Sequence, residues 1–499
     1  MLWKLYKIHL IVLVPILIFF TYNLSKLIKN SLKEYNLKYK ILALPLVMLF
    51  LMIGARSSFD SSTPNQGYYT FSSSNIKNEI ANNSIFSILY ATYLLKKEKF
   101  YEYGEISSEK AIANINKIND FSTFDQNSLL RFQKSTYSEK KNIILIILES
   151  FGNDHVGYLG GTNTTPNLDS LTNESLYFTN LYATGARTSW GLSSILTSLY
   201  PIPSREYIKA AKSQKEFYTI AKTLKKHGYE NTFIFPGDAD FDNMRGFFLS
   251  NGYDKVLGKE NFNRTKHLKY TWGYCDEALY EKAIDQIEKY KDKDKPFFLT
   301  MLTISSHEPF DYPKGRVKPY KNAKLEGFAN SIKYADHSLG KFIVELKKKG
   351  LMENTVVAII ADHCNDANGE FDVPINRYKI PALILSEDFK KKRGVKYNKI
   401  ASQIDFAPTI LDVAGVSDYI PTVGSSILQN QRNSAILLAK RKNFAYLLQD
   451  SFIVYTGDSN IQTYNYKFKK IKNINKDVIN GLSYIYGSKY LYDNKILYN

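Results

Sequence analysis

Four short, predominantly apolar runs in this chain each end at or just before a reactive side chain. They are separated by segments with helical periodicity. Such runs are typical of strands in a parallel sheet that helices cover on both faces. The runs are Asn142 to Leu148, Asn231 to Phe235, Phe297 to Thr303 and Thr355 to Ala361. We therefore predict an α/β fold with a mainly parallel central sheet.

The polar residues that follow these runs are the first candidates for a functional site. In open α/β sheets, ligands bind just outside the carboxyl ends of the strands. Five such residues are far apart in the sequence but should meet at one edge of the sheet. They are Glu149, Asp238, His307, Asp362 and His363. This pattern indicates an enzyme.

Helical patterns fill the segments between the predicted strands. One covers Ala211–His227 and ends at a glycine, and amphipathic helices are predicted over Trp272–Tyr290 and Phe328–Lys349. Beyond about residue 430 the apolar runs become short and aromatic, as in Tyr446–Tyr455. This change favours a small terminal sheet.

The N-terminal part contains two apolar segments on either side of a basic loop. Leu10–Phe20 and Ile41–Ala55 each contain a central proline, and with their flanks each can span or nearly span a bilayer. The loop between them carries five lysines and one glutamate. Because cytoplasmic loops are enriched in basic residues, everything after Ala55 is predicted to lie outside the membrane. Buried core helices are the alternative interpretation.

Charge and cysteine content narrow the possible partners. The net charge of +18 indicates anionic surroundings, and the apolar segments favour an anionic membrane over nucleic acid. No aromatic and basic motif for reading bases is visible, so we expect no nucleic-acid partner. The two cysteines, Cys275 and Cys364, are too few for a disulfide framework and lack the spacing of a zinc ribbon.

A metal site is predicted from Glu149, Asp362 and His363. Two carboxylates and one imidazole suit Mn²⁺, Mg²⁺ or Zn²⁺ held with an open position for a nucleophile. Asp154-His155 resembles a second metal-binding pair. That pair lies several residues past a strand end in a glycine-rich loop, so a solvated loop is the better interpretation.

The segment GARTSWG (residues 185–191) supplies the candidate nucleophile. It precedes a helical stretch, so Thr188 or Ser189 is expected at a helix N-terminus, where backbone N–H groups and the helix dipole favour an anion. A neighbouring metal ion would activate such a hydroxyl for attack. An ordinary helix cap is the alternative for either residue, and the nearby metal cluster disfavours it.

Two further residues are predicted to contact a phosphorylated substrate. His307 lies in a loop after a strand, where it can hydrogen-bond a phosphoryl oxygen or protonate a leaving group. A structural histidine is the alternative. Arg245 can bind a phosphate through hydrogen bonds from its planar guanidinium group. The alternative for Arg245 is a salt bridge to Asp238, Asp240 or Asp242.

Together the motifs resemble those of the alkaline phosphatase/sulfatase superfamily, and specifically the lipoteichoic acid synthase-like phosphoglycerol transferases. The resemblance covers roughly residues 141–411. Seven motifs carry it in the family's order: NIILIILESF, TPNLDSL, GARTSWG, FPGDADFDNMRGFFLSNGYD, TISSHEPF, IIADH and SQIDFAPTIL. The resemblance implies a sulfatase-like α/β sandwich built around the predicted sheet.

The resemblance also implies a role for each candidate site residue. The family's metal ligands fall on Glu149, Thr188, Asp362 and His363. Its substrate-binding histidine falls on His307 and its phosphate-binding arginine on Arg245. Asp238, at the same edge of the sheet, is also expected to contact the substrate. Thr188 is then also the nucleophile, and His307 is the second catalytic residue. The implied cofactor is one divalent metal ion, Mn²⁺ in first place, with Mg²⁺ or Zn²⁺ as alternatives.

The chain departs from the pattern of the synthases at two positions. Pro236 stands where they have a histidine before the glycine of the FPGD segment. The tryptophan expected near Arg245 is absent, and Asn243 lies nearby instead. These departures bear on the donor and acceptor rather than on the reaction class. True sulfatases carry a cysteine in the nucleophile motif; no cysteine lies near Thr188, which disfavours sulfate-ester hydrolysis by that route.

We therefore expect a membrane-anchored, metal-dependent phosphoglycerol transferase. It would move phosphoglycerol from phosphatidylglycerol to a cell-envelope polymer or glycan through a phospho-threonine intermediate, with its catalytic domain outside the plasma membrane. The alternatives are phosphoethanolamine transfer or sulfatase-type ester hydrolysis on the same fold, and a degenerate lipid- or glycan-binding module. The expected domains are a two-helix membrane anchor (1–56), extracytoplasmic linker helices (57–138), a catalytic domain (139–430) and a small-sheet subdomain (431–499).

Overall fold

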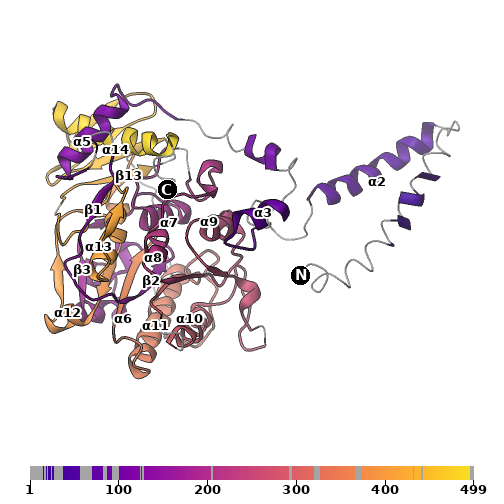
Figure 1. Ribbon diagram of the computed structural model, residues 1–499, viewed down its shortest axis with the longest axis horizontal. Helices are drawn as coiled ribbons and strands as arrows, with labels where there is room; N and C mark the ends of the chain where they lie inside the picture. The colour runs from indigo at the N-terminus through magenta and orange to yellow at the C-terminus, as the bar shows by residue number, and fades with distance from the viewer. Residues whose placement is uncertain are drawn as a thin grey trace. The chain divides into compact units, whose positions relative to one another are not determined.

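The chain divides into two compact units, Met1–Pro64 and Asn65–Asn499. Figure 1 shows the computed structural model. The structure describes residues 15, 18–19, 21–23, 25–26, 37–56, 70–81, 87–92, 100–123, 125, 128–203, 206–263, 265–291, 295–319, 326–365, 372–430, 432–439 and 442–494. The four domains predicted from the sequence stay a prediction.

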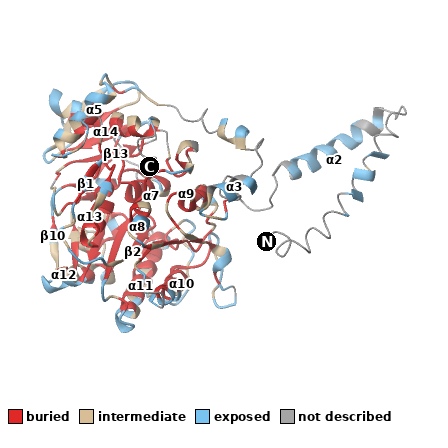
Figure 2. Cartoon of the chain, in the orientation of Figure 1, coloured by how far each residue is buried: buried red, intermediate tan, exposed pale blue. Residues whose placement is uncertain are grey.

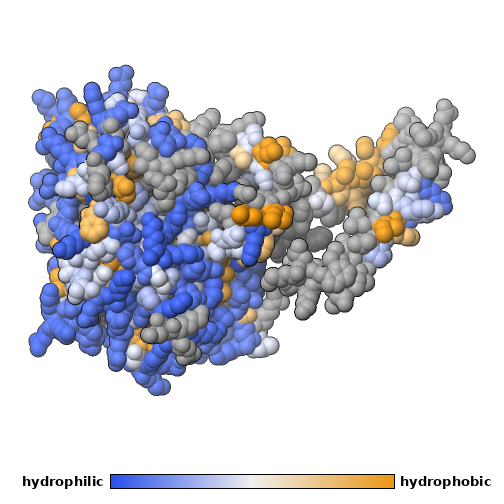
Figure 3. Space-filling view, viewed as in Figure 1, coloured by the Kyte–Doolittle hydropathy of each residue, from blue (hydrophilic) through white to orange (hydrophobic). Residues whose placement is uncertain are grey.

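The first unit contains helix α2 (Leu37–Arg56), which exposes many apolar side chains (Figure 3). Among the described residues, no helix combines the length and the apolarity that a membrane crossing requires. The predicted transmembrane helix over Ile41–Ala55 is therefore not confirmed. Of the other predicted segment, Leu10–Phe20, only residues 15, 18 and 19 are described.

An eight-stranded sheet forms the centre of the second unit, as far as its described residues show, in the order β10-β3-β9-β8-β2-β7-β5-β6. Its strands are β2 (Asn142–Leu148), β3 (Ser175–Phe178), β5 (Glu230–Ile234), β6 (Lys255–Leu257), β7 (Phe297–Leu302), β8 (Thr355–Ala361), β9 (Ala382–Leu385) and β10 (Val395–Tyr397). β9 runs antiparallel to both of its neighbours, and the other neighbouring pairs are parallel. The predicted α/β fold with a mainly parallel sheet is confirmed.

The apolar runs became the middle strands because they can be buried on both faces. All residues of β7 and β8 are buried, and in β2 only Asn142 is partly exposed. β2 lies between β8 and β7, paired from Asn142 with Thr355 to Leu148 with Ala361 on the β8 side. This register brings the carboxyl ends of the middle strands to the same edge.

Helices pack against the sheet and are buried where they meet it (Figures 1 and 2). α8 contacts β5, α10 contacts β7 and α13 contacts β8. The helices described in this unit include α3 (Asn75–Ala81), α5 (Ser108–Ile118), α6 (Pro166–Ser170), α7 (Thr188–Thr197), α8 (Ile220–Lys226), α9 (Met244–Ser250), α10 (Asp276–Lys291), α11 (Glu326–Lys348), α12 (Glu387–Lys391), α13 (Phe406–Val413) and α14 (Asn475–Asp493).

The single helix predicted over Ala211–His227 was wrong. A short 3-10 turn covers Ala211–Gln214, and α8 begins only at Ile220. Glu216 between them has a φ of 57°, a left-handed conformation that interrupts a right-handed helix. The hydroxyl of Thr219 then accepts a backbone N–H of α8 at 3.4 Å and starts the new helix.

A second, antiparallel sheet lies C-terminal to the central sheet. Its strands, in order, are β13 (Ala435–Ala439), β14 (Asn443–Leu447), β15 (Ser451–Tyr455), β16 (Ile461–Asn465) and β17 (Lys470–Ile471). Two short pairs complete the described strands: β1 (Arg131–Gln133) with β12 (Asp418–Ile420), and β4 (Leu181–Tyr182) with β11 (Ala401–Ser402). The N–H of Leu438 in β13 donates to the carbonyl of Thr184 at 2.8 Å, so this sheet supports the loop that leads into α7.

Helix α7 approaches the end of β8 so closely that only a glycine fits at the contact. A Cβ on Gly191 would lie 2.2 Å from the carbonyl oxygen of Asp362 and 2.8 Å from its carbonyl carbon. That carbonyl also accepts a hydrogen bond from the side-chain amide of Gln403 at 2.7 Å. The first turn of α7 is thereby held next to the residues that follow β8.

We predict that Gly191→Ala destabilises the protein by about 1–3 kcal/mol, because the added methyl group meets backbone atoms that cannot turn away. Urea unfolding of the purified chain measures the effect. Gly327→Ala is the matched control, since a Cβ there meets only a Phe310 side-chain atom at 3.3 Å. Equal midpoints for the two variants would contradict the close packing of α7.

Candidate active site

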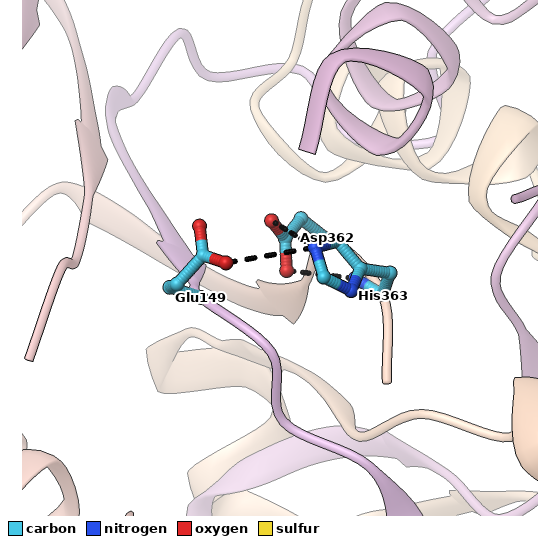
Figure 4. Close-up of side chains that lie close together, drawn as sticks. All are labelled: Glu149, Asp362 and His363. Carbon is cyan, nitrogen blue, oxygen red and sulfur yellow. Dashed lines mark hydrogen bonds and ion pairs between the residues drawn. The ribbon is translucent and has the colours of Figure 1, made fainter. Parts of the chain in front are cut away.

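Glu149, Asp362 and His363 form a compact cluster at the carboxyl ends of β2 and β8 (Figure 4). One possible ligand atom from each lies within 4.8 Å of the others, and all three residues are buried. The Nε2 atom of His363 is 3.5 Å from Glu149 Oε1 and 3.4 Å from Asp362 Oδ2. The structure thus brings together three of the ligands predicted from the sequence.

Backbone contacts orient these side chains toward a common point. Asp362 Oδ1 accepts the N–H groups of Ser150 at 2.8 Å and His363 at 2.7 Å. Its buried Oδ2 accepts no hydrogen bond from the described residues. The carbonyl of Cys364 lies 2.8 Å from His363 Nδ1, which leaves Nε2 facing the carboxylates. A buried carboxylate oxygen without a donor is costly, so this donor set fits a cation.

The charges in the cluster are strongly coupled. Burial raises the pKa of Asp362, and the Glu149 carboxylate raises it further. Burial acts in the same direction on Glu149, but the hydrogen bond and the charge of His363 outweigh it and lower the pKa of that carboxyl. Burial would lower the pKa of His363, but the two carboxylates raise it above its ordinary value. A cation bound here would replace the proton that the carboxylates draw to the imidazole.

Of the two candidate hydroxyls, that of Thr188 lies at the cluster. Thr188 is the first residue of α7, and its Oγ1 is 3.2 Å from Glu149 Oε2 and 3.3 Å from His363 Nε2. The Ser189 hydroxyl instead donates to Glu206 Oε2 at 2.8 Å. At the helix N-terminus, therefore, the hydroxyl of Thr188 and not that of Ser189 lies next to Glu149 and His363.

His307 shares a cavity with Glu149 and Thr188. Most of the other residues that line this cavity are apolar or aromatic, among them Leu192 and Trp272. The Nδ1 atom of His307 is 3.0 Å from the carbonyl oxygen of Glu308, so Nε2 is the nitrogen left for a substrate. A phosphoryl group in this cavity would lie between walls that include the Thr188 hydroxyl and the His307 imidazole.

Arg245 and Asp238 are not among the described residues that line the cavity. The guanidinium of Arg245 donates to Asp240 and Glu260, each at 2.7 Å. This is the salt-bridge alternative stated above, with Asp240 as one partner. Asp238 accepts from Lys259 Nζ at 2.6 Å. The substrate-binding roles of Arg245 and Asp238 stay predictions.

Sequence reasoning missed Trp272. We assigned it to a helix over Trp272–Tyr290, but α10 begins at Asp276 and Trp272 lies in the loop before it. The centroids of its ring and of the His307 ring are 4.1 Å apart, with 47° between the ring planes. The sequence offered one signal for Trp272. The chain has three tryptophans, and this one lies after the FPGD segment and directly before a glycine, which favours a turn.

The chain is similar in sequence to curated bacterial proteins. Lipoteichoic acid synthase 2 of Bacillus subtilis is 26% identical over 383 residues, which cover 70% of this chain and 56% of that protein. Phosphoglycerol transferase I of Xanthomonas campestris pv. campestris is 26% identical over 344 residues, which cover 64% of this chain and 48% of that protein. The chain thus spans about half the length of these curated relatives.

Two solved structures are similar to this chain. A protein in the alkaline phosphatase superfamily from Vibrio parahaemolyticus is 33% identical, with a TM-score of 0.75 over 80% of this chain and 98% of that chain. The lipoteichoic acid synthase LtaP of Listeria monocytogenes is 21% identical, with a TM-score of 0.64 over 77% of this chain and 98% of that chain, and shows the fold alone. The sulfatase family model matches residues 141–416, more than half of the chain. The resemblance inferred from the sequence is confirmed: the chain belongs to the sulfatase family.

Proposed function

We propose that the protein is a metal-dependent phosphoglycerol transferase that works through a phospho-threonine intermediate. The observation that carries this proposal is the position of Thr188 Oγ1, 3.2 Å from Glu149 Oε2 and 3.3 Å from His363 Nε2. Its hydroxyl opens onto the cavity that His307 also lines. The names of the relatives, lipoteichoic acid synthase 2 and phosphoglycerol transferase I, support the class of transferred group.

One divalent metal ion would complete the site, Mn²⁺ in first place, with Mg²⁺ or Zn²⁺ as alternatives. Its ligands would be Glu149, Thr188, Asp362 and His363. The buried Asp362 Oδ2 without a hydrogen-bond donor supports this ligand set. When bound, such an ion makes the threonine hydroxyl a stronger nucleophile and offsets negative charge on the phosphoryl oxygens.

In the first half-reaction, Thr188 Oγ1 attacks the phosphorus of phosphatidylglycerol. A bond from Oγ1 to phosphorus forms, and the bond from phosphorus to the diacylglycerol oxygen breaks. His307 enters this step protonated on both ring nitrogens and donates its Nε2 proton to that leaving oxygen, which leaves the neutral ring with its proton on Nδ1. Glu149 Oε2, the acceptor of the Thr188 hydrogen bond, receives the threonine proton. Phosphoglycerol is then held on Thr188 as an ester.

In the second half-reaction, a hydroxyl of a cell-envelope polymer or glycan attacks the same phosphorus. His307 takes the proton of the attacking hydroxyl, and the bond from phosphorus to Thr188 Oγ1 breaks. The threonine regains its proton from Glu149, so the site returns to its starting state. The cavity walls, largely apolar, would limit competition by water at this step.

We also propose that the enzyme acts at the outer face of the plasma membrane. A lipid donor requires contact with a bilayer, and the net charge of +18 favours an anionic surface. The exposed apolar side chains of α2, among them Leu42 at 77% and Phe50 at 67% exposure, support insertion into lipid.

The function is tested with the full chain, Mn²⁺ and vesicles that contain labelled phosphatidylglycerol. We expect release of diacylglycerol and a phosphoglycerol adduct on Thr188 by mass spectrometry. Thr188→Ala should reduce release at least about 1000-fold, because the nucleophile is lost. Ser193→Ala is the matched control within α7, since the Ser193 hydroxyl donates to the carbonyl of Ser189 inside the helix and away from the cluster. Full release by Thr188→Ala would overturn the mechanism, and release only from phosphatidylethanolamine would make the protein a phosphoethanolamine transferase.

The metal site is tested by titration of Mn²⁺ into the metal-free full chain. Asp362→Asn should weaken binding at least about 100-fold, because even the loss of a supporting contact to a metal ligand costs 10–100-fold. Asp154→Asn is the matched control: Asp154 lies in the loop after β2, and its side chain is half exposed and paired with Arg377. Equal affinities for Mn²⁺ in the two variants would contradict the proposed ligand set.

The membrane contact is tested by sedimentation with phosphatidylglycerol vesicles. Leu42→Glu should lower the bound fraction, because burial of a leucine side chain stabilises by roughly 1.5–3 kcal/mol and a charge opposes insertion. Ile471→Glu, at another exposed apolar position, should leave binding unchanged. Unaltered sedimentation of the α2 variant would argue against lipid contact through this helix.

A further inference from the structure

Trp272 lies in a tight turn that is pinned at its base. Lys269 and Tyr274 form an antiparallel bridge across this turn, and the N–H of Tyr270 donates to the carbonyl of Gly273 at 2.7 Å. These contacts leave Trp272 next to the end of the turn, ahead of α10. Trp272 is partly buried, with 37% of its surface exposed.

Two loops of the active-site edge hold the turn in place. Gly273 pairs with Gly237, and a Cβ on Gly273 would lie 2.3 Å from the carbonyl oxygen of Pro236, so the turn rests directly on the loop after β5. The Thr271 hydroxyl donates to Asp311 Oδ2 at 2.6 Å, which ties the turn to the loop after β7. The position of Trp272 is therefore set by the same loops that build the cavity.

Trp272 packs against the His307 ring and shares a hydrogen-bond partner with it. The indole ring lies against the imidazole at 4.1 Å between centroids, and Phe241 packs edge-on against the indole at 5.6 Å. The indole N–H donates to the carbonyl of Glu308 at 2.6 Å, and His307 Nδ1 lies 3.0 Å from the same oxygen. A carbonyl oxygen has two lone pairs, so it can accept both N–H groups.

The loop that carries His307 has a separate anchor. Asp276 Oδ1 accepts the backbone N–H groups of Ile304 at 2.9 Å and Ser305 at 3.2 Å. The backbone before His307 is thus held by Asp276, whereas the ring of His307 is held by Trp272 and Glu308. Loss of the indole would free the imidazole without releasing the loop.

We propose that Trp272 is a positioning residue that keeps the proton of neutral His307 on Nδ1 and leaves Nε2 facing the Thr188 cavity. The indole face blocks rotation of the imidazole, and the indole N–H fixes the carbonyl that accepts the Nδ1 proton. This inference deepens the proposed function: it rests on that function for the role of His307 in proton transfer. The contacts of Trp272 with His307 and Glu308 do not depend on the proposed function.

The geometric half is tested by nitrogen NMR of the full chain in detergent, with ¹⁵N-labelled histidine, above the titration range of the imidazoles. The chain has seven histidines, and the His307 signals are those lost in His307→Asn. We expect the Nδ1–H form of His307 in the parent protein and a shift toward the Nε2–H form in Trp272→Ala. Trp272→Phe, which keeps a ring but loses the N–H donor, should lie between them. The same His307 form in all three proteins would overturn the proposal.

The functional half is tested by diacylglycerol release in a double-mutant cycle. Trp272→Ala should lower kcat about tenfold or more in the parent protein but less than about twofold in a His307→Ala background, because misplacing a proton donor costs only where that donor is present. Equal losses in both backgrounds would overturn positioning through His307. Altered histidine spectra without any lipid turnover by the parent protein would instead refute the proposed function and leave the positioning role intact.

Discussion

The parallel pairing of β2 with β8 is the constraint on which the site depends. The register runs from Asn142 with Thr355 to Leu148 with Ala361, so Glu149 follows one strand and Asp362 follows the other at the same level. A shift by one residue would turn every side chain of β2 to the opposite face of the sheet. The observed register brings together the groups that can hold a cation.

Two neighbouring elements complete this arrangement. Helix α7 presents Thr188 because Gly191 lets its backbone come against the carbonyl of Asp362. The terminal sheet supports the entry to α7 through the bond from Leu438 to Thr184. Contacts at both ends of this segment thus hold the threonine hydroxyl near Glu149 and His363. The terminal sheet, although it carries no predicted site residue, is part of what positions the nucleophile.

Electrostatics explains why so polar a cluster is tolerated inside the protein. Asp362 is fully buried, and one of its oxygens accepts no hydrogen bond from the described residues. Such a group lowers stability unless a charge compensates it. The carboxylates draw a proton to His363 and would exchange it for a divalent cation. Residues that weaken the folded state in this way are typical of functional sites, where perturbed pKa values cluster.

The sequence by itself determined the four neighbouring strands β2, β5, β7 and β8, the membership of the sulfatase family and the residues that gather at the ends of β2 and β8. Those features follow from apolar runs and local motifs, which act over a few residues. Tertiary structure decided which hydroxyl meets the cluster, since Thr188 and Ser189 differ only in direction from the helix. It also paired Arg245 with Asp240 and Glu260, and set Trp272 against His307. Those contacts join side chains from separate loops. The local pattern of apolar and polar residues does not indicate which distant loops will meet or which of their side chains will be in contact.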